Sequence, residues 1–413
     1  MSQKKKLKAE SLMMSHGFDP KDAMGSVKPP LFQTSTFVFN NAEEGNAFFE
    51  LAYGVREKEE NEDLGYIYTR INNPNLEILE QRLAIWDNAD GAAVFASGMA
   101  AITTSMLTFL KAGDLLLFSS PLYGGTDHFI HDYLKEMGVT SIAFKAGQSQ
   151  DEIEALIEKS GKADKLAMIY AETPANPNNA MIDIKMCRDI ANKFQSKNNK
   201  EVIVAIDNTY MGPVWCQPLD HGADISVYSA TKYLGGHSDI VAGSVAGNAE
   251  IMQRIKTLRT FFGNMATPHT SWLMSRSLET LKIRMEAQAA SAEKIAHFLN
   301  DHPKVEKVYY LGLIPEGTEE YNLYKRQYTA PGAMISFDIK GGKKEAFAFL
   351  NNLKLMHLAV SLGSTESLVQ HPASMTHIAV DNEHKKEIGI TDKLIRMSVG
   401  VENVDDLIDD IKE

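Results

Sequence analysis

Two segments place chemically useful side chains directly after apolar runs. The run 202–206 is followed by Asp207, an acid at the carboxyl end of an expected strand, which is where open α/β sheets bind ligands. Further on, the run 225–228 is followed by Ser229–Lys232, a turn that carries two hydroxyl groups and one amine. A strand-terminal acid is commonly a helix cap, and a lysine is mostly a surface residue, so neither feature is informative alone. Together they indicate a site.

A third segment has the pattern of an anion-binding site. Ser97-Gly98-Met99 opens an expected helix directly after the apolar run 92–95, and backbone N–H groups at such a helix start bind phosphate. A lysine amine, a carboxylate and a phosphate cradle are what pyridoxal phosphate (PLP) chemistry requires, because the amine forms a Schiff base and the acid keeps the pyridine nitrogen protonated. Lys232 and Asp207 supply these two groups. The expected phosphate ligands are Gly98, Met99, Ser229 and Thr231.

The elements that must position these residues alternate along the middle of the chain. Helical patterns are expected near 76–86, 99–110, 151–159 and 184–194, and short apolar runs lie at 92–95, 115–118, 166–170, 202–206 and 225–228. This alternation predicts an α/β domain with a mostly parallel sheet. A helical region over 271–299 then leads into strands at 333–339 and 394–399 and helices at 344–350 and 404–411. This mixture predicts a smaller α+β C-terminal domain.

Composition limits the classes of function. The 413 residues carry a formal charge of -12, which argues against nucleic-acid binding, since that requires clustered Lys and Arg. No apolar run is long enough to cross a membrane, so we expect no membrane partner. Cys187 and Cys216 are the two cysteines and have no metal-ligand spacing, so we expect neither a disulfide framework nor a metal. The basic start near Lys4–Lys8 lacks the apolar stretch of a secretory signal, and a cytoplasmic location is expected.

Ten short stretches spread along the chain carry a resemblance to a known family. They are Tyr66–Arg70, Ser97–Ala101, Tyr123–Thr126, Glu172–Pro177, Asp207–Thr209, Ser229–Tyr233, Gly236–Asp239, Ser361–Gly363, His371–His377 and Leu394–Gly400. In number and order they resemble the Cys/Met metabolism family of PLP-dependent enzymes, from about Pro29 to Asp406. The resemblance implies the aminotransferase-like fold, also called fold type I.

The resemblance also implies roles for individual residues. Lys232 would form the Schiff base and move protons, Asp207 would meet the pyridine nitrogen, and Tyr123 would stack on the ring and take part in catalysis. Asn176 would lie near the phenolic oxygen of the cofactor. Arg396 would hold the substrate carboxylate, with Ser361 supporting it and the lysine.

An assembly is implied as well. Tyr68 and Arg70 resemble a pair that reaches the phosphate of a neighbouring subunit, so we expect a homotetramer, a dimer of dimers, with shared sites. Three parts are expected: an arm over 1–70 that contacts the neighbour, a PLP-binding large domain over 71–270, and a linking helix with the smaller domain over 271–413. The charged stretch 56–63 would lie near the entrance of the shared site.

The family catalyses γ-elimination or γ-replacement on sulfur amino acids or O-activated homoserine, and the sequence departs from its members in opposite directions. Methionine γ-lyases characteristically have Cys where this chain has Gly125 and a Lys-Asp pair near 261–264, where it reads Phe-Phe-Gly-Asn. Members that handle cystathionine usually have Glu where this chain has Val360. The leading interpretation is a methionine γ-lyase-like C–S lyase. The alternative is γ-replacement, as in cystathionine γ-synthase or O-acetylhomoserine sulfhydrylase.

Two alternatives from other classes are disfavoured. An aspartate-aminotransferase-type enzyme would share the fold but not the motifs that contain Tyr68, Arg70 and Ser361. A non-catalytic scaffold would have no reason to retain the ionisable set of Asp207, Lys232 and Arg396 together.

Overall fold

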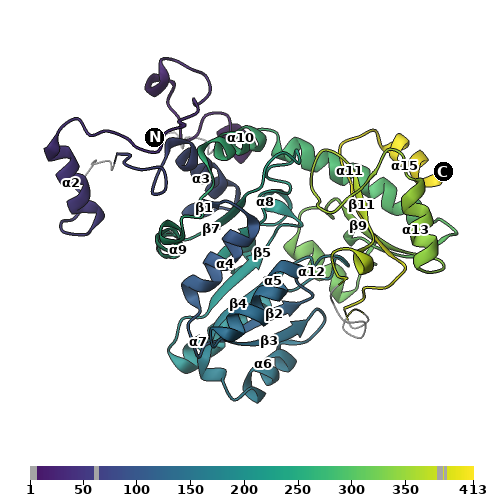
Figure 1. Cartoon of the computed structure of the whole chain (residues 1–413). Helices are drawn as coiled ribbons and strands as arrows, with labels where there is room; N and C mark the ends of the chain where they lie inside the picture. Colours follow the sequence, from purple (N-terminus) through teal and green to yellow (C-terminus); the bar gives the residue numbers. More distant parts are fainter. Residues whose placement is uncertain (1–6, 60–64, 379–384, 386–387) are drawn as a thin grey trace, which may run out of the picture.

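The computed structural model describes residues 7–59, 65–378, 385 and 388–413, which form two β-sheets with their helices (Figure 1). The larger sheet has seven strands in the order β1-β7-β6-β5-β4-β2-β3. Their bounds are β1 Gly91–Phe95, β2 Leu115–Ser120, β3 Thr140–Lys145, β4 Leu166–Glu172, β5 Ile203–Asp207, β6 Ile225–Tyr228 and β7 Gly243–Gly247. Strands β3, β2, β4, β5 and β6 run parallel, while β7 is antiparallel to its neighbours β6 and β1. The predicted α/β fold is confirmed.

The central strands are apolar along their length because both faces of the large sheet are covered. Every residue of β2, β4 and β5 is buried. Successive side chains point to opposite faces, so Ile169 and Ala171 of β4 belong to one apolar cluster and Met168 and Tyr170 to another. The helices of this domain are α3 Pro74–Trp86, α4 Gly98–Phe109, α5 Gly124–His128, α6 Gln150–Lys159, α7 Ile184–Asn198, α8 Gly212–Trp215, α9 Ala249–Phe262 and α10 Pro268–Leu278.

A smaller, five-stranded sheet forms the C-terminal part, as predicted, with the order β10-β11-β12-β9-β8. Its strands are β8 Val305–Tyr309, β9 Met334–Ile339, β10 His357–Leu358, β11 Leu368–Gln370 and β12 Leu394–Ser398. Its helices are α11 Leu281–Asn300, α12 Glu319–Gln327, α13 Lys343–Asn352 and α15 Val404–Lys412. The domain boundaries placed near residues 70 and 270 stay predictions.

The helical region expected over 271–299 is divided into α10 and α11. The two helices meet at Glu279 and Thr280, and the Thr280 backbone leaves the helical conformation with φ -114° and ψ 7°. The side chain of Arg284 crosses this break, because its guanidinium donates to the carbonyl of Ser277 at 3.1 Å and to the Thr280 hydroxyl at 3.3 Å. The Ser277 carbonyl is a group that a continuous helix would use internally. Apolar periodicity alone does not report such a break.

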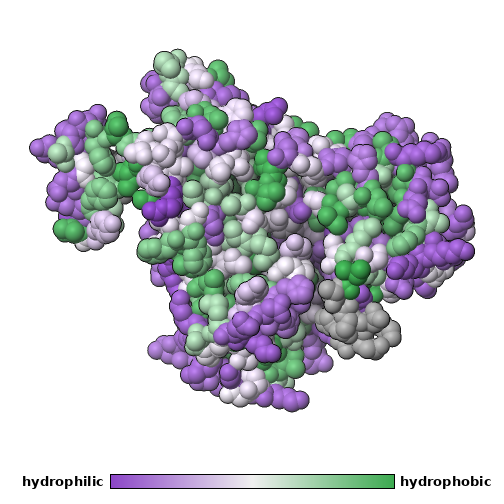
Figure 2. All heavy atoms as spheres, viewed as in Figure 1, coloured by the Kyte–Doolittle hydropathy of each residue, from purple (hydrophilic) through white to green (hydrophobic). Residues whose placement is uncertain are grey.

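The N-terminal part lies partly away from the body of the molecule. Helix α2, Ala42–Ala52, projects at the end of an extended segment and stands apart in the space-filling view (Figures 1 and 2). Several apolar side chains near it are exposed, including Tyr53 at 80% and Val55 at 74%. The extended segment is fixed to the chain ahead of α3 by a bridge between Thr36 and Tyr68.

Parts of two predicted segments lie outside the described residues. These are residues 60–63 of the charged stretch and Lys4–Lys6 of the basic start. Within the described portion of the chain, no helix combines the length and the apolar character needed to cross a bilayer.

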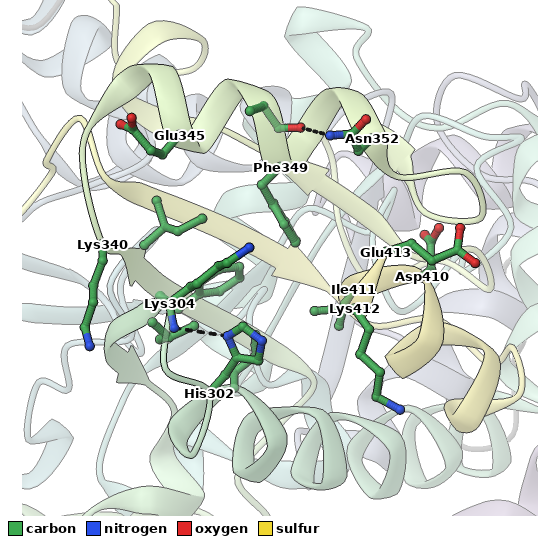
Figure 3. Close-up of a pocket in the computed structure, with 15 residues that line it drawn as sticks. His302, Lys304, Lys340, Glu345, Phe349, Asn352, Asp410, Ile411, Lys412 and Glu413 are labelled. Carbon is green, nitrogen blue, oxygen red and sulfur yellow. Dashed lines mark hydrogen bonds between the residues drawn. The ribbon is translucent and has the colours of Figure 1, made fainter.

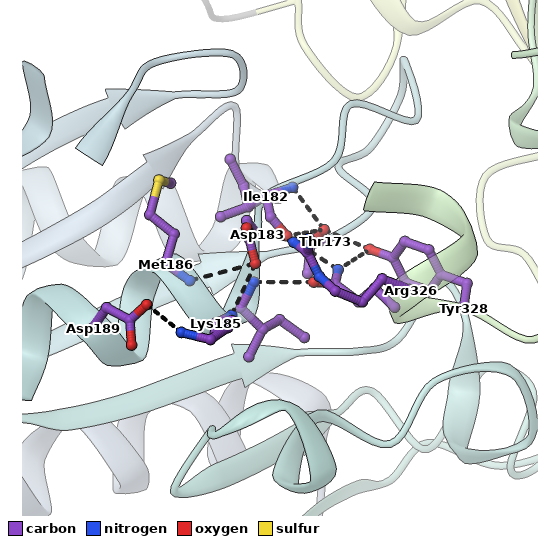
Figure 4. A network of polar contacts seen from close by, with 10 residues as sticks. Thr173, Ile182, Asp183, Lys185, Met186, Asp189, Arg326 and Tyr328 are labelled. Atoms are coloured by element: carbon purple, nitrogen blue, oxygen red, sulfur yellow. Dashed lines mark hydrogen bonds and ion pairs between the residues drawn. The ribbon is translucent and has the colours of Figure 1, made fainter. Parts of the chain in front are cut away.

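A polar network joins the large domain to α12 behind the loop that follows β4 (Figure 4). The Thr173 hydroxyl lies 2.7 Å from the Tyr328 hydroxyl and accepts from the Ile182 N–H at 2.9 Å. Arg326 donates to Asp183, the cap of α7, at 2.6 Å. Because these groups tie the loop to helices on both sides, the network holds the end of β4 in place.

A buried ion pair joins α3, β1 and α9. Glu80 accepts from Arg259, from Lys256 at 2.6 Å and from the Val94 N–H at 3.1 Å. Glu80 and Arg259 are both buried, so removing one partner leaves a charge without compensation.

We therefore expect Glu80→Ala to lower the free energy of unfolding by about 3–5 kcal/mol. The urea midpoint of the first unfolding transition, followed by circular dichroism, measures the effect. The matched control is Glu250→Ala at an exposed position of α9, which should cost less than about 0.5 kcal/mol. Equal midpoints for the two variants would show that the buried ion pair of Glu80 and Arg259 does not contribute to stability.

Candidate active site

A cavity of about 320 Å³ opens where the carboxyl ends of β4, β5 and β6 meet the start of α4 and strand β12 of the smaller sheet. This is the edge at which parallel sheets bind ligands. Ten of the residues singled out from the sequence line it together: Gly98, Met99, Tyr123, Asn176, Asp207, Ser229, Thr231, Lys232, Ser361 and Arg396. Tyr68 and Arg70 are not among its lining residues.

Lys232 lies on the turn after β6, and its amine points to the smaller domain. The turn is closed by a bond from the Lys232 N–H to the Ser229 carbonyl at 3.0 Å. The amine donates to the Ser361 hydroxyl at 2.7 Å. Burial, followed by the positive charge of Arg396, lowers the pKa of Lys232 to about 8. A larger fraction of this amine is therefore neutral near pH 7 than for an ordinary lysine.

Ser361 holds the lysine and the arginine at once. Its hydroxyl accepts from Lys232, and its carbonyl accepts from the Arg396 guanidinium at 2.6 Å. Its φ of 97° is rare for a residue with a side chain and carries a conformational cost. This backbone conformation presents the hydroxyl and the carbonyl of one residue to two different cations.

Arg396 is fixed on β12 with only 3% of its surface exposed. Besides Ser361 it donates to the Asn176 side-chain oxygen at 3.1 Å. The amide of Gln370, turned so that its oxygen faces the guanidinium, accepts at 2.9 Å. Asn176 is itself oriented by the Tyr210 hydroxyl, which donates to the same oxygen at 2.7 Å. A buried guanidinium held only by neutral groups keeps its charge available for a carboxylate.

Asp207 ends β5 as a buried carboxylate without a cationic partner among the described residues. One oxygen accepts from the Thr209 N–H at 3.0 Å and from the Thr209 hydroxyl at 2.6 Å, and the other accepts from Tyr170 at 3.1 Å. Burial raises the pKa of Asp207 above its usual range, and the bonds from Thr209 act against that rise. The carboxylate therefore favours a positively charged group beside it.

Glu172 is a second buried acid, and the sequence analysis gave it no role. It lies beside Asp207 in the register of β4 and β5. Its carboxylate accepts from the N–H of Tyr123 at 2.7 Å and from the N–H of Asn176 at 2.9 Å. Burial and the negative charge of Asp207 raise the pKa of Glu172 to about 8. Glu172 ends an apolar strand and lies in the stretch Glu172–Pro177, which resembles the family. The signal that identified Asp207 was therefore present for Glu172 as well.

Three further residues of the site were missed: Thr209, Tyr210 and Gln370. Thr209 is prominent, because its hydroxyl also accepts from the Ser229 N–H at 2.9 Å and so links Asp207 to the lysine turn. Thr209 and Gln370 both lie in or beside stretches that the sequence analysis singled out, but a hydroxyl or amide that acts through a neighbour has no signature of its own.

The start of α4 forms a narrow cradle against the lysine turn. Ser97 caps the helix by accepting from the Ala100 N–H at 3.0 Å. A Cβ atom on Gly98 would come within 2.8 Å of the Ser229 side chain, so only glycine permits this approach. The N–H groups of a first helical turn have no partner inside the helix and suit an anion. The Thr231 hydroxyl also lines the cavity, but here it is paired with the backbone of Ala242.

Tyr123, Tyr68 and Arg70 lie at more open positions. The Tyr123 side chain borders the cavity with 46% of its surface exposed, and its N–H is fixed by Glu172. Arg70 donates to the carbonyl of Thr260 at 2.7 Å, and its guanidinium lies 5.8 Å from the centre of the Tyr68 ring. This pair therefore serves no part of its own chain's cavity.

Comparison with known proteins gives one consistent result. A family model described as Cys/Met metabolism PLP-dependent enzyme matches residues 10–413. The L-methionine gamma-lyase of Porphyromonas gingivalis is 41% identical, covering 98% of each chain, and the cystathionine gamma-lyase of Bacillus subtilis is 38% identical, also covering 98% of each. The crystal structure of cystathionine gamma synthase from Xanthomonas oryzae pv. oryzae in complex with cystathionine matches with a TM-score of 0.86 at 31% identity, over 98% of this chain and 97% of that one.

The cavity fits PLP on its own chemistry. It contains a buried carboxylate that lacks a cation, a lysine whose amine is partly neutral, and a glycine-lined helix start, and these match a pyridine nitrogen, an aldehyde and a phosphate. Within the described ranges, no group of three or more His, Cys, Asp or Glu side chains is arranged to hold a metal ion.

The lowered pKa of Lys232 predicts an unusual pH profile in the cofactor-free protein. Only the neutral amine is a nucleophile, so acylation of Lys232 by a small amine-reactive reagent should rise with pH and be half-maximal at about pH 8. Peptide mass spectrometry reads the extent at each lysine, and exposed lysines in the same digest should go on gaining reactivity up to about pH 10.

The variant Arg396→Gln removes the neighbouring positive charge and should move the Lys232 midpoint to higher pH. A Lys232 profile that follows the exposed lysines, or one that does not move in the variant, would count against this electrostatic account.

Proposed function

The chain belongs to the Cys/Met metabolism family of PLP-dependent enzymes, and from this premise we propose that it is a methionine γ-lyase-like carbon–sulfur lyase. PLP-dependent trans-sulfuration chemistry is established by the family. The choice of methionine-type substrates and of elimination is the proposal. The observation that carries it is Val360, an apolar side chain, 56% exposed, at the cavity beside Ser361.

Each lining residue has a proposed part in holding the cofactor. Lys232 would bind it covalently, Asp207 would meet the pyridine nitrogen, and Tyr123 would cover the ring. Asn176 would lie near the phenolic oxygen. The phosphate would be held by Gly98, Met99, Ser229 and Thr231, with Tyr68 and Arg70 of the neighbouring subunit. When bound, PLP supplies an electron sink that acidifies the α-proton of the amino acid attached to it.

The protein's own groups would bind the amino acid and move protons. The guanidinium of Arg396, held by Asn176, Gln370 and the Ser361 carbonyl, would bind the substrate carboxylate as a fork. Once released from the cofactor, the Lys232 amine would take the α-proton and return protons nearby, a task that suits a pKa of about 8. The Ser361 hydroxyl, 2.7 Å from this amine, would orient it.

In the proposed net reaction the bond between Cγ and sulfur breaks. Methionine and water give methanethiol, ammonia and 2-oxobutanoate, so no external oxidant or reductant is needed. The cavity mouth favours this over cystathionine because cystathionine brings a second ammonium group. The acids among the described lining residues, Glu172 and Asp207, are buried and already hydrogen-bonded. An ammonium group beside the half-exposed Val360 would therefore find no free acid among the described lining residues.

A second candidate is γ-replacement on an O-acylated homoserine. It is favoured by Gly125, which leaves the position beside Tyr123 without a thiol or other functional side chain. A Cβ atom there would come within 2.7 Å of the Tyr123 ring and 3.0 Å of the Met99 sulfur. γ-Replacement requires access for an incoming thiol and no functional side chain at position 125. The site is therefore compatible with γ-replacement as well as with γ-elimination.

We also propose a homotetramer, a dimer of dimers with shared sites, and a cytoplasmic location. Tyr68 and Arg70 lie outside the cavity of their own chain, and the exposed apolar residues near α2 suit burial against a second subunit. Cys187 and Cys216 are buried free thiols, which suits a reducing compartment.

A substrate panel tests the proposed activity. Methionine, homocysteine, cystathionine and O-acetyl- and O-succinylhomoserine are each supplied with and without cysteine or sulfide, and 2-oxobutanoate and thioether products are quantified. We expect the highest kcat/KM for 2-oxobutanoate from methionine or homocysteine. Highest kcat/KM on cystathionine, or thioether as the main product, would overturn the proposal, and Lys232→Ala should abolish all turnover.

The variant Val360→Glu tests the reason for that preference. An acid at the cavity mouth should raise kcat/KM for cystathionine relative to methionine by roughly five- to thirtyfold, because one partly solvated ion pair contributes about 1–2 kcal/mol. Val360→Thr, of similar shape but neutral, is the matched control and should leave the ratio near that of the wild type. An unchanged ratio in Val360→Glu would remove Val360 as the determinant.

Mixed subunits test the shared site. The Lys232→Ala protein should be inactive, and the Arg70→Ala protein should turn over poorly when PLP is limiting. After joint unfolding and refolding in equal amounts, about one quarter of the sites should regain both residues, since mixed dimers contain one intact site. Activity no greater than the average of the two separate proteins would show that Arg70 does not serve a neighbouring site.

A further inference from the structure

A second cavity lies in the smaller domain, on the face of its sheet that points away from the catalytic cavity. It measures about 330 Å³ and lies between α11, α13, α15 and strands β8 and β9 (Figure 3). On β9, Ser336 pairs with Arg396 and donates to the carbonyl of Pro177 at 2.5 Å, so it faces the large domain. Phe337 and Ile339 alternate with it and line the second cavity. A molecule bound there would not touch the catalytic residues.

The floor of this cavity is apolar. Leu299 and Phe337 are buried beneath it, and Figure 3 shows the Phe349 ring pointing down from α13 into the space. The volume is close to that of the catalytic cavity and is sufficient for a small organic molecule. Such a floor favours an occupant with an apolar body over an inorganic ion.

The acids around the cavity are already occupied. Asp410 accepts from three successive backbone N–H groups, those of Lys354, Leu355 and Met356, at 2.7, 3.1 and 3.0 Å. Glu345 accepts from the Gly342 N–H at 2.8 Å, and Glu413 is paired with Lys354. Their charges are therefore directed at groups of the protein itself.

Two lysines at the cavity have no comparable partner. Among the described residues, neither Lys304 nor Lys340 forms an ion pair, whereas Lys412 is paired with Asp409 at 2.8 Å. In Figure 3 the Lys304 side chain reaches between His302 and Phe349 toward the middle of the cavity, while Lys340 lies along its edge. Among the described side chains at this cavity, the uncommitted charge is therefore positive.

We propose that this cavity binds a small monocarboxylate with an apolar body. The apolar part would cover Phe337 and Phe349, and the carboxylate would meet Lys304 and Lys340. Both interactions are needed, because partly exposed lysines hold an anion weakly and an apolar floor alone does not select for charge. The apolar floor and the two lysines together match such a molecule, whichever sulfur substrate the enzyme uses.

The holoenzyme tests the proposal with 4-phenylbutyrate as the probe and its neutral amide, 4-phenylbutanamide, for comparison. Binding is measured by titration calorimetry and by saturation-transfer NMR. We expect saturable binding of the acid, and binding of the amide weaker by roughly three- to tenfold, the contribution of a partly solvated charge contact. No saturable binding of the acid would overturn the proposal, and so would equal affinity for the acid and the amide.

Variants locate the site. The double variant Lys304→Gln, Lys340→Gln should bind the acid only as tightly as the amide, and its affinity for the amide should equal that of the wild type. Ala348→Trp, which fills the cavity from α13, should remove binding of both. Lys344→Gln, at an exposed position of the same helix that does not line the cavity, is the matched control. Binding that persists in Ala348→Trp and competes with the amino-acid substrate would place the acid at Arg396 instead and overturn the proposal.

Discussion

The candidate active site depends on a single junction between the two sheets, the one that Ser361 makes with Lys232 and Arg396. Lys232 belongs to the turn after a strand of the large sheet, and Arg396 belongs to the central strand β12 of the smaller sheet. One serine in a left-handed backbone conformation accepts from both. Like charges repel, so the fold and the two hydrogen bonds to Ser361 hold the amine and the guanidinium near the same residue. Other contacts also link these parts of the chain: Thr173 pairs with Tyr328, and Arg284, beside the break at Thr280, donates to the Tyr233 carbonyl next to Lys232 at 3.0 Å.

Unlike the two cations, the two acids of the site do not share one hydrogen-bonding residue. Asp207 and Glu172 end neighbouring parallel strands in register, so the large sheet brings two carboxylates together out of water. Such a pair is costly unless each charge is satisfied by donors. Glu172 is satisfied by two backbone N–H groups of the loops that carry Tyr123 and Asn176, and in return it fixes those loops. Among the described residues, Asp207 accepts from Thr209 and Tyr170 and has no cationic partner, which makes it suitable for a protonated pyridine nitrogen.

Much of this arrangement could be predicted from the sequence, and the omissions have physical reasons. Fully buried strands such as β4 and β5 read as continuous apolar runs, so the alternation of strands and helices and the positions of Asp207 and Lys232 were recognisable. Strand β7, with the sequence Gly-Ser-Val-Ala-Gly, has too few large side chains to show a strand pattern, and its antiparallel direction is set by its neighbours. The Arg284 side chain crosses the split between α10 and α11, and apolar periodicity does not report such a contact. Residues that act through another residue, such as Thr209 and Gln370, acquire meaning only when the fold brings their partners close.

The same guanidinium that would bind the substrate also contributes to the lowered basicity of the Lys232 amine. Its positive charge is one of the two causes that lower the pKa of Lys232, burial being the larger. A substrate carboxylate placed on Arg396 would offset that charge, so the electrostatic part of the depression would diminish as the substrate binds. In the enzyme without cofactor and substrate, a larger fraction of the amine would thus be neutral and able to react with the aldehyde of the cofactor. The amine would become a stronger base with substrate present, when it must take a proton. Ser361 holds both groups, so this change in the pKa of Lys232 would need no movement of the backbone. The buried charge of Arg396 would first bind the substrate carboxylate and, through that binding, assist proton transfer by Lys232.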